Sequence, residues 1–160
     1  MKKLFAIAAA LLLTVCAFAQ DGKSFYQKYS DYPNVSAVYI SPAMFRLIGK
    51  LPEIDLGAGE VNVSSIVKSL NGFYLIDSEN ADINDKIKKD ADKLVSGGKY
   101  ELLLEAKDDG DIVHIYTVGD DNVINNLVMI ASEPNEITCI CLDGKILRED
   151  LEKLVAAAME

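Results

Sequence analysis

Three side chains in this sequence have the chemistry of catalytic or metal-binding groups, namely His114, Cys139 and Cys141. His114 is the only histidine, and it lies between Val113 and Ile115 in a stretch with the composition of a strand. A general base there would need a partner acid and, for acyl transfer, a nearby nucleophile, yet the chain contains no Gly-x-Ser-x-Gly sequence. We therefore predict no catalytic residue. An enzyme that uses His114 remains a third hypothesis, after two binding functions.

The two cysteines could join His114 as ligands of a tetrahedral metal ion, because such sites accept mixed Cys and His. Cys139 and Cys141 are two residues apart, so in a strand both would point to the same side. Free cysteine also packs as a small apolar residue in protein cores, and we favour that reading. The acidic stretches 108–111 and 120–122 lack the EF-hand spacing and are typical of turns. We predict no metal site and no cofactor.

The first residues have the pattern of a cleavable signal peptide. Lys2 and Lys3 precede an apolar run over residues 4–15, and small residues lead to a cleavage site between Ala19 and Gln20. The run is shorter than the ~20 residues that a membrane-spanning helix needs. We expect a signal peptide over residues 1–19 and a periplasmic or secreted protein without a transmembrane segment in the mature chain. The alternative is a lipid anchor on Cys16, which Val15 disfavours.

The remaining residues, 20–160, are enough for one domain with a single core. The whole chain has 16 basic and 25 acidic residues, and loss of Lys2 and Lys3 changes the formal charge from −9 to −11. A surface this acidic repels phosphate backbones and anionic lipid. We therefore predict no nucleic-acid partner.

Hydrophobic periodicity predicts six strands and about four short helices. The strands are expected at residues 34–40, 73–77, 100–106, 112–118, 126–131 and 137–142. The helices are expected at residues 42–51, 65–70, 79–95 and 147–158, with a loop over 53–62 and a break in the last strand at Asp143 and Gly144. Short turn sequences join the last four strands. These features predict an α+β domain whose mostly antiparallel sheet ends in a four-strand meander.

Several apolar segments carry a further resemblance. Residues 38–45 read VYISPAMF, residues 100–103 read YELL and residues 126–129 read NLVM. With these segments the chain resembles an exported family of Gram-negative bacteria, catalogued as domain of unknown function 4252, over most of residues 25–157. The resemblance implies export and a compact domain, and it carries no activity or catalytic residue to any position.

Several predicted strands are apolar on both faces, whereas an antiparallel sheet with one solvated face alternates apolar and polar residues. Either helices cover both faces, or one face is partly bare and needs a protein partner, a second copy or an apolar ligand. The candidate interaction face comprises Val113, Ile115, Val128, Ile130, Ile140 and Leu142. Our leading hypothesis is an exported, non-catalytic protein that interacts with a protein partner or self-associates in the cell envelope. The alternative is a periplasmic binder of a small apolar ligand.

Overall fold

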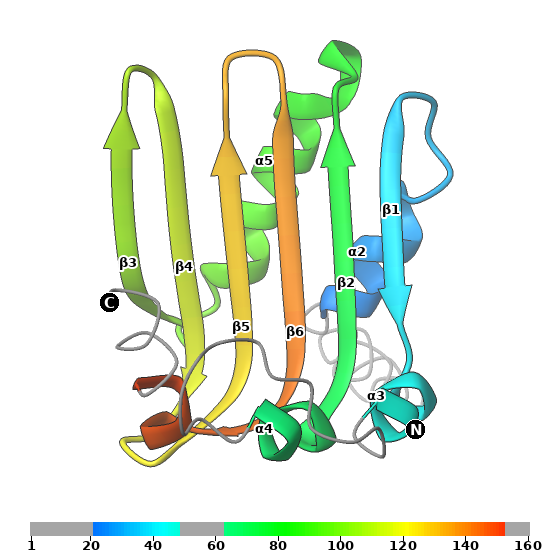
Figure 1. Cartoon of the computed structure of the whole chain (residues 1–160). Coiled ribbons are helices and arrows are strands. Elements are labelled where there is room, and N and C mark those ends of the chain that lie inside the picture. The colour runs from blue at the N-terminus through cyan, green and yellow to red at the C-terminus, as the bar shows by residue number, and fades with distance from the viewer. Residues whose placement is uncertain (1–20, 49–62, 153–160) are drawn as a thin grey trace, which may run out of the picture.

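A computed structural model describes residues 21–48 and 63–152 of the chain. Six strands form one sheet in the order β1-β2-β6-β5-β4-β3, and every neighbouring pair is antiparallel (Figure 1). The strands are β1 (Val35–Ile40), β2 (Leu70–Ser78), β3 (Glu101–Asp108), β4 (Asp111–Gly119), β5 (Val123–Ser132) and β6 (Ile137–Leu147). The α+β class, the six strands and the meander from β3 to β6 are confirmed.

Turn chemistry explains both the meander and one error in the strand prediction. Asp109 and Gly110 have φ of 44° and 99°, which suits a two-residue hairpin between β3 and β4. The predicted break at Gly144 is wrong, because β6 continues through this glycine to Leu147. Gly144 pairs with Leu70 of β2, and a Cβ atom at Gly144 would lie 2.7 Å from the backbone oxygen of Ser69. Glycine therefore permits a close approach of two strands here and does not end the strand.

Two helices, α2 (Gly22–Tyr29) and α5 (Ala81–Val95), pack on the same face of the sheet (Figure 1). The sequence patterns predicted α5 but not α2. The carboxylate of Asp21 caps α2 by accepting a hydrogen bond of 2.8 Å from the backbone N–H of Ser24. Phe25 and Tyr29 of α2 are fully buried with Ile87 of α5 in the main core. We name this side of the sheet the helix-covered face.

The remaining helical segments lie at one end of the sheet (Figure 1). They are α3 (Pro42–Ile48), α4 (Val63–Ser69) and residues 148–152. A second, smaller core forms there from Ile66, Ile124 and Ile146, with Leu142 and Leu151 packed against it. The ends of the helices predicted at 42–51 and 147–158, together with the loop predicted at 53–62, lie largely or wholly outside the described residues.

No helix among the described residues is long and apolar enough to cross a membrane. The predicted signal peptide, its cleavage site at Ala19 and Gln20, and Cys16 lie outside the described residues.

Candidate interaction surface

The face opposite α2 and α5, which we name the open face, carries an unbroken row of apolar side chains. Residues directly opposite each other in an antiparallel ladder point to the same side of the sheet. Following these pairs from β3 to β1 gives Leu104, Ile115, Met129, Ile140, Leu75 and Val38. We call these six residues the apolar row. Each strand contributes one member, so the row crosses the whole sheet.

Neighbouring positions extend the apolar character of this face. Leu127 and Phe73 flank the row on one side, and Val113 and Ala131 flank it on the other. Within the described residues, no helix packs over the row itself, because the second core covers only the end of the face near Leu142. In the described part of the chain, the open face therefore resembles an inner layer that is largely without an outer layer over it.

The six residues predicted as one interaction face separate into three groups. Val113, Ile115 and Ile140 lie on the open face. Leu142 points to the same side but packs against the second core. Val128 and Ile130 are each only 2 % exposed and belong to the main core, so their assignment to this face is wrong. The reason is register, since Val128 pairs with Tyr116 and Cys141 on the helix-covered face.

Strand β3 forms one edge of the sheet, and all eight of its residues are exposed. Leu102, Leu103 and Leu104 are 48 %, 46 % and 43 % exposed. Three consecutive exposed leucines on an edge strand are unusual, because such edges can pair with other chains. The sequence shows these leucines plainly, but only the strand order places them at an edge.

His114 has a partner acid, Glu105, on the adjacent strand β3. Its Nε2 atom lies 2.7 Å from a carboxylate oxygen of Glu105, and the Lys107 ammonium lies 2.9 Å from the other oxygen. Hydrogen bonds from Lys107 and His114 lower the pKa of the Glu105 carboxyl. The His114 side chain is 24 % exposed, and its ring lies 5.8 Å from that of Tyr116. Glu105 is the partner acid that a general base at His114 would need. The neighbouring side chains, Glu105, Lys107 and Tyr116, do not include an activated nucleophile.

The two cysteines do not reach His114. His114 pairs with Ile130 on β5, and Ile130 pairs with Cys139 on β6. Two strand spacings, or ~10 Å, therefore separate the backbones of His114 and Cys139. Cys139 and Cys141 are free and buried in the main core, where burial raises the pKa of both thiols. Within the described residues, no group of three or more His, Cys, Asp or Glu side chains is arranged to hold a metal ion.

Gly22 explains how α2 reaches the sheet beside Cys141. A Cβ atom at Gly22 would lie 2.5 Å from the Cβ of Cys141, which is closer than two such atoms can approach. Because Gly22 has no side chain, the first turn of α2 can pack directly on β6.

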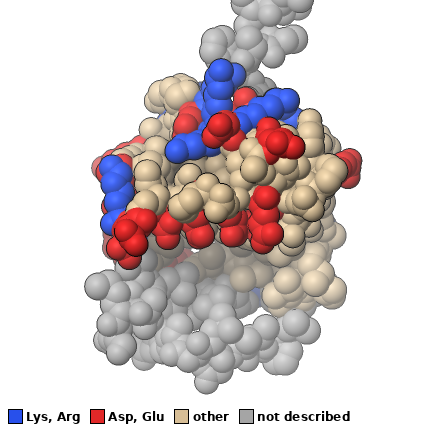
Figure 2. Space-filling model, turned by 90° about the horizontal axis from the view of Figure 1, so that it is seen from above, with Lys and Arg blue, Asp and Glu red and all other residues tan. Residues whose placement is uncertain are grey.

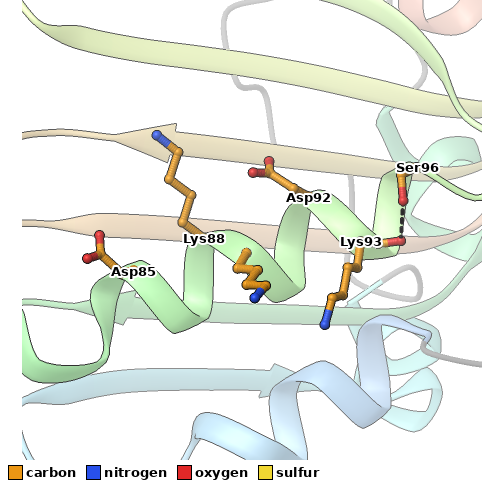
Figure 3. Close-up of a pocket in the computed structure, with 6 residues that line it drawn as sticks. Asp85, Lys88, Asp92, Lys93 and Ser96 are labelled. Atoms are coloured by element: carbon orange, nitrogen blue, oxygen red, sulfur yellow. Dashed lines mark hydrogen bonds between the residues drawn. The ribbon is translucent and has the colours of Figure 1, made fainter.

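A depression of about 520 Å³ lies along the outer surface of α5. Its described lining is one helical stripe, which comprises Asp85, Lys88, Lys89, Asp92, Lys93 and Ser96 (Figure 3). The charged side chains diverge from the helix, and the Ser96 hydroxyl donates a hydrogen bond of 3.1 Å to the backbone oxygen of Lys93. This charged lining does not suit an apolar ligand.

Acidic side chains gather at the end of the sheet that carries the β3–β4 and β5–β6 turns (Figure 2). Asp77, Glu79, Glu133 and Glu136 lie close enough for their charges to interact. The neighbouring carboxylates, first among them Asp77, raise the pKa of Glu136. We call this end the acidic end, and it disfavours any partner that brings a second negative surface to the same place.

The model of a family described as "Domain of unknown function (DUF4252)" matches residues 29–154. No curated protein and no solved structure matches the chain.

Proposed function

This chain belongs to the family described as domain of unknown function 4252, and we propose that it acts without catalysis, as an exported module that self-associates through its open face. The apolar row from Leu104 to Val38 is the observation that supports this proposal. A continuous apolar surface of this kind marks an interaction site more often than isolated exposed leucines do.

The size of the open face fits a second copy of the chain. Six strands spaced ~4.8 Å apart span ~29 Å, and about six residues of each strand beyond the second core add ~20 Å. The footprint is therefore ~580 Å² per copy and ~1,160 Å² for a pair, just above the ~1,000 Å² expected of a specific interface. A second copy would also supply an outer layer over the part of the open face that the described helices leave uncovered.

The acidic end predicts how two copies are oriented. If both acidic ends lay at the same end of the pair, Glu133 and Glu136 of each copy would add to the repulsion that Glu136 already experiences. A two-fold axis perpendicular to the strands places the acidic end of one copy over the opposite end of the other. We expect this arrangement.

The test is the oligomeric state of residues 20–160, measured by native mass spectrometry and by light scattering after gel filtration. Met129→Asp places a charge in the middle of the apolar row and should remove the open-face contact. Asn125→Asp is the matched control, because it adds the same charge at an exposed position of the same strand. Circular dichroism checks that both variants fold. A wild-type chain that stays monomeric at high concentration would overturn the proposal.

The same spectra separate two other functions. A monomer that carries extra mass would support the small apolar ligand held on the open face. A bare monomer would leave a transient protein partner, cover of the open face by residues 49–62 or 153–160 of the same chain, or chemistry at His114 and Glu105. Deletion of residues 153–160 would then show whether the open face becomes available to a second copy.

A further inference from the structure

Met129 has the chemistry and the position of an oxidation site that controls the open face. We propose that oxidation of its thioether to the sulfoxide abolishes the self-association proposed above, and that reduction of the sulfoxide restores it. The inference rests on that proposed function. It adds a modification site to the open face and names the class of co-substrate, a hydroperoxide.

Few sulfur atoms are open to an oxidant in the folded chain. The sequence has three cysteines and four methionines, and the first of each would leave with the predicted signal peptide. Cys139 and Cys141 are each 2 % exposed, and burial raises the pKa of both thiols, so little of the reactive thiolate forms. Among the described residues, the sulfur atoms that an oxidant can reach are therefore those of Met44 and Met129.

These two methionines differ in their surroundings. Met44 is 47 % exposed on α3, at one end of the sheet and outside the apolar row (Figure 1). Met129 is partly exposed and belongs neither to the main core nor to the second core. Its directly paired neighbours are Ile115 of β4 and Ile140 of β6, and all three are members of the apolar row. Met129 is therefore the thioether that a second copy on the open face would cover.

The oxidation is a two-electron transfer of one oxygen atom. The sulfur lone pair attacks one oxygen of hydrogen peroxide, so that an S–O bond forms while the O–O bond breaks. The proton on the transferred oxygen moves to the departing hydroxide, which leaves as water. Sulfur is oxidised and the peroxide is reduced, and the step needs no further co-reactant. The sulfoxide is polar, and methionine sulfoxide reductases can convert it back to the thioether.

A sulfoxide on Met129 does not suit a dry contact between two open faces. The nearest neighbours of Met129 on this face are all apolar, namely Ile115, Leu127, Ala131 and Ile140. They offer no hydrogen-bond donor to the new oxygen, and burial of a polar group without a partner weakens association by about tenfold or more. Each copy contributes one sulfoxide, so we expect the dissociation constant to rise by at least about 100-fold.

Association and oxidation should also oppose each other kinetically. Contact with a second copy covers the thioether, so peroxide reaches Met129 in the separated copies. The oxidation rate of Met129 should therefore fall as the protein concentration rises through the dissociation constant, whereas the rate of Met44 should stay constant. Peptide mass spectrometry after timed exposure of residues 20–160 to hydrogen peroxide measures both rates in one sample.

Substitutions isolate the effect of Met129. Met129→Leu keeps an apolar side chain of similar volume and should remain associated in peroxide. Met129→Gln places a neutral polar group at the same site and should be monomeric without peroxide. Met159 lies outside the described residues, so the double variant Met44→Leu, Met159→Leu serves as the control and should respond as the wild type does. Circular dichroism checks that each variant and the oxidised wild type remain folded.

Native mass spectrometry before and after peroxide distinguishes this inference from the proposed function. We expect a wild-type dimer, a monomer with one added oxygen at Met129 after treatment, and a dimer again after reduction by methionine sulfoxide reductases. If the dimer persists with Met129 oxidised, or if Met129→Leu dissociates in peroxide as the wild type does, the oxidation proposal is wrong and the open-face proposal stands. The oxidation proposal is equally wrong if Met44 is oxidised at every protein concentration and Met129 at none. A monomeric untreated wild type would overturn both proposals.

Discussion

The phenol of Tyr29 donates a hydrogen bond of 2.7 Å to the carboxylate of Asp90 and so joins α2 to α5. Tyr29 is fully buried and Asp90 is 6 % exposed. Lys28 forms a hydrogen-bonded ion pair with the same carboxylate oxygen, and the Lys93 ammonium lies 3.6 Å from the other oxygen. Because a buried carboxylate without partners is costly, these contacts determine how the two helices pack together.

Loss of the Tyr29 hydroxyl should weaken this junction. We expect Tyr29→Phe to lower the free energy of unfolding by about 1.5–3 kcal/mol, as for other hydrogen bonds to charged groups. Tyr32→Phe is the control, because Tyr32 is 37 % exposed and close in the sequence. Urea unfolding followed by circular dichroism measures both. Equal stability of the two variants would contradict a structural role for the hydrogen bond.

The Asp90 junction should also lose stability in acid. Burial by itself would raise the pKa of the Asp90 carboxyl, but hydrogen bonds from Lys28 and Tyr29 bring it below its usual value. The folded state then binds fewer protons than the unfolded state, so the contribution is complete above the unfolded pKa of about 3.9 and is lost as pH falls through the folded value. We expect the stability difference between wild type and Asp90→Asn to shrink below about pH 4. A difference that is constant with pH would exclude this linkage.

The two core thiols should be unreactive in the folded protein. Burial raises the pKa of the Cys141 thiol to about 12 and raises that of Cys139 as well, so little thiolate is present at neutral pH. We expect no reaction of residues 20–160 with an aromatic disulfide reagent at pH 8, and two reactive thiols per chain after denaturation. Fast modification of the native protein would show that the region between α2 and β6 opens.

Export should leave Gln20 as the first residue. A full-length chain expressed in a Gram-negative host should appear in the periplasm with the mass of residues 20–160. A chain retained in the membrane with lipid on Cys16 would instead support the lipid-anchored alternative. Replacement of Ala19 by a bulky residue should block the predicted cleavage, whereas the same change at Gln20 should have a smaller effect.

Local sequence was enough to identify most elements of this fold. Strand composition and turn residues located all six strands. The helix predicted at 79–95 is found as α5, which is capped by Asn80 and begins at Ala81. Helix α2 was missed because only two large apolar side chains, Phe25 and Tyr29, mark its buried side. The other local sign of this helix is its cap, Asp21. Phe25 and Tyr29 are buried by contacts with parts of the chain that are distant in sequence.

The alternation of side chains along a strand sorts its residues into two sets, one for each face of the sheet. It does not tell which set of one strand lies on the same face as a given set of the neighbouring strand. That depends on register, and the ladder of β4 with β5 contains a shift between Val118 and Gly119, next to the turn that joins these two strands. Val128 and Ile130 therefore joined the core, while Met129 joined the open face. Composition and periodicity thus account for an α+β chain with apolar strands, because these features depend on neighbours in sequence. The apolar row, the β3 edge and the Tyr29–Asp90 junction exist only once strands and helices distant in sequence are packed together.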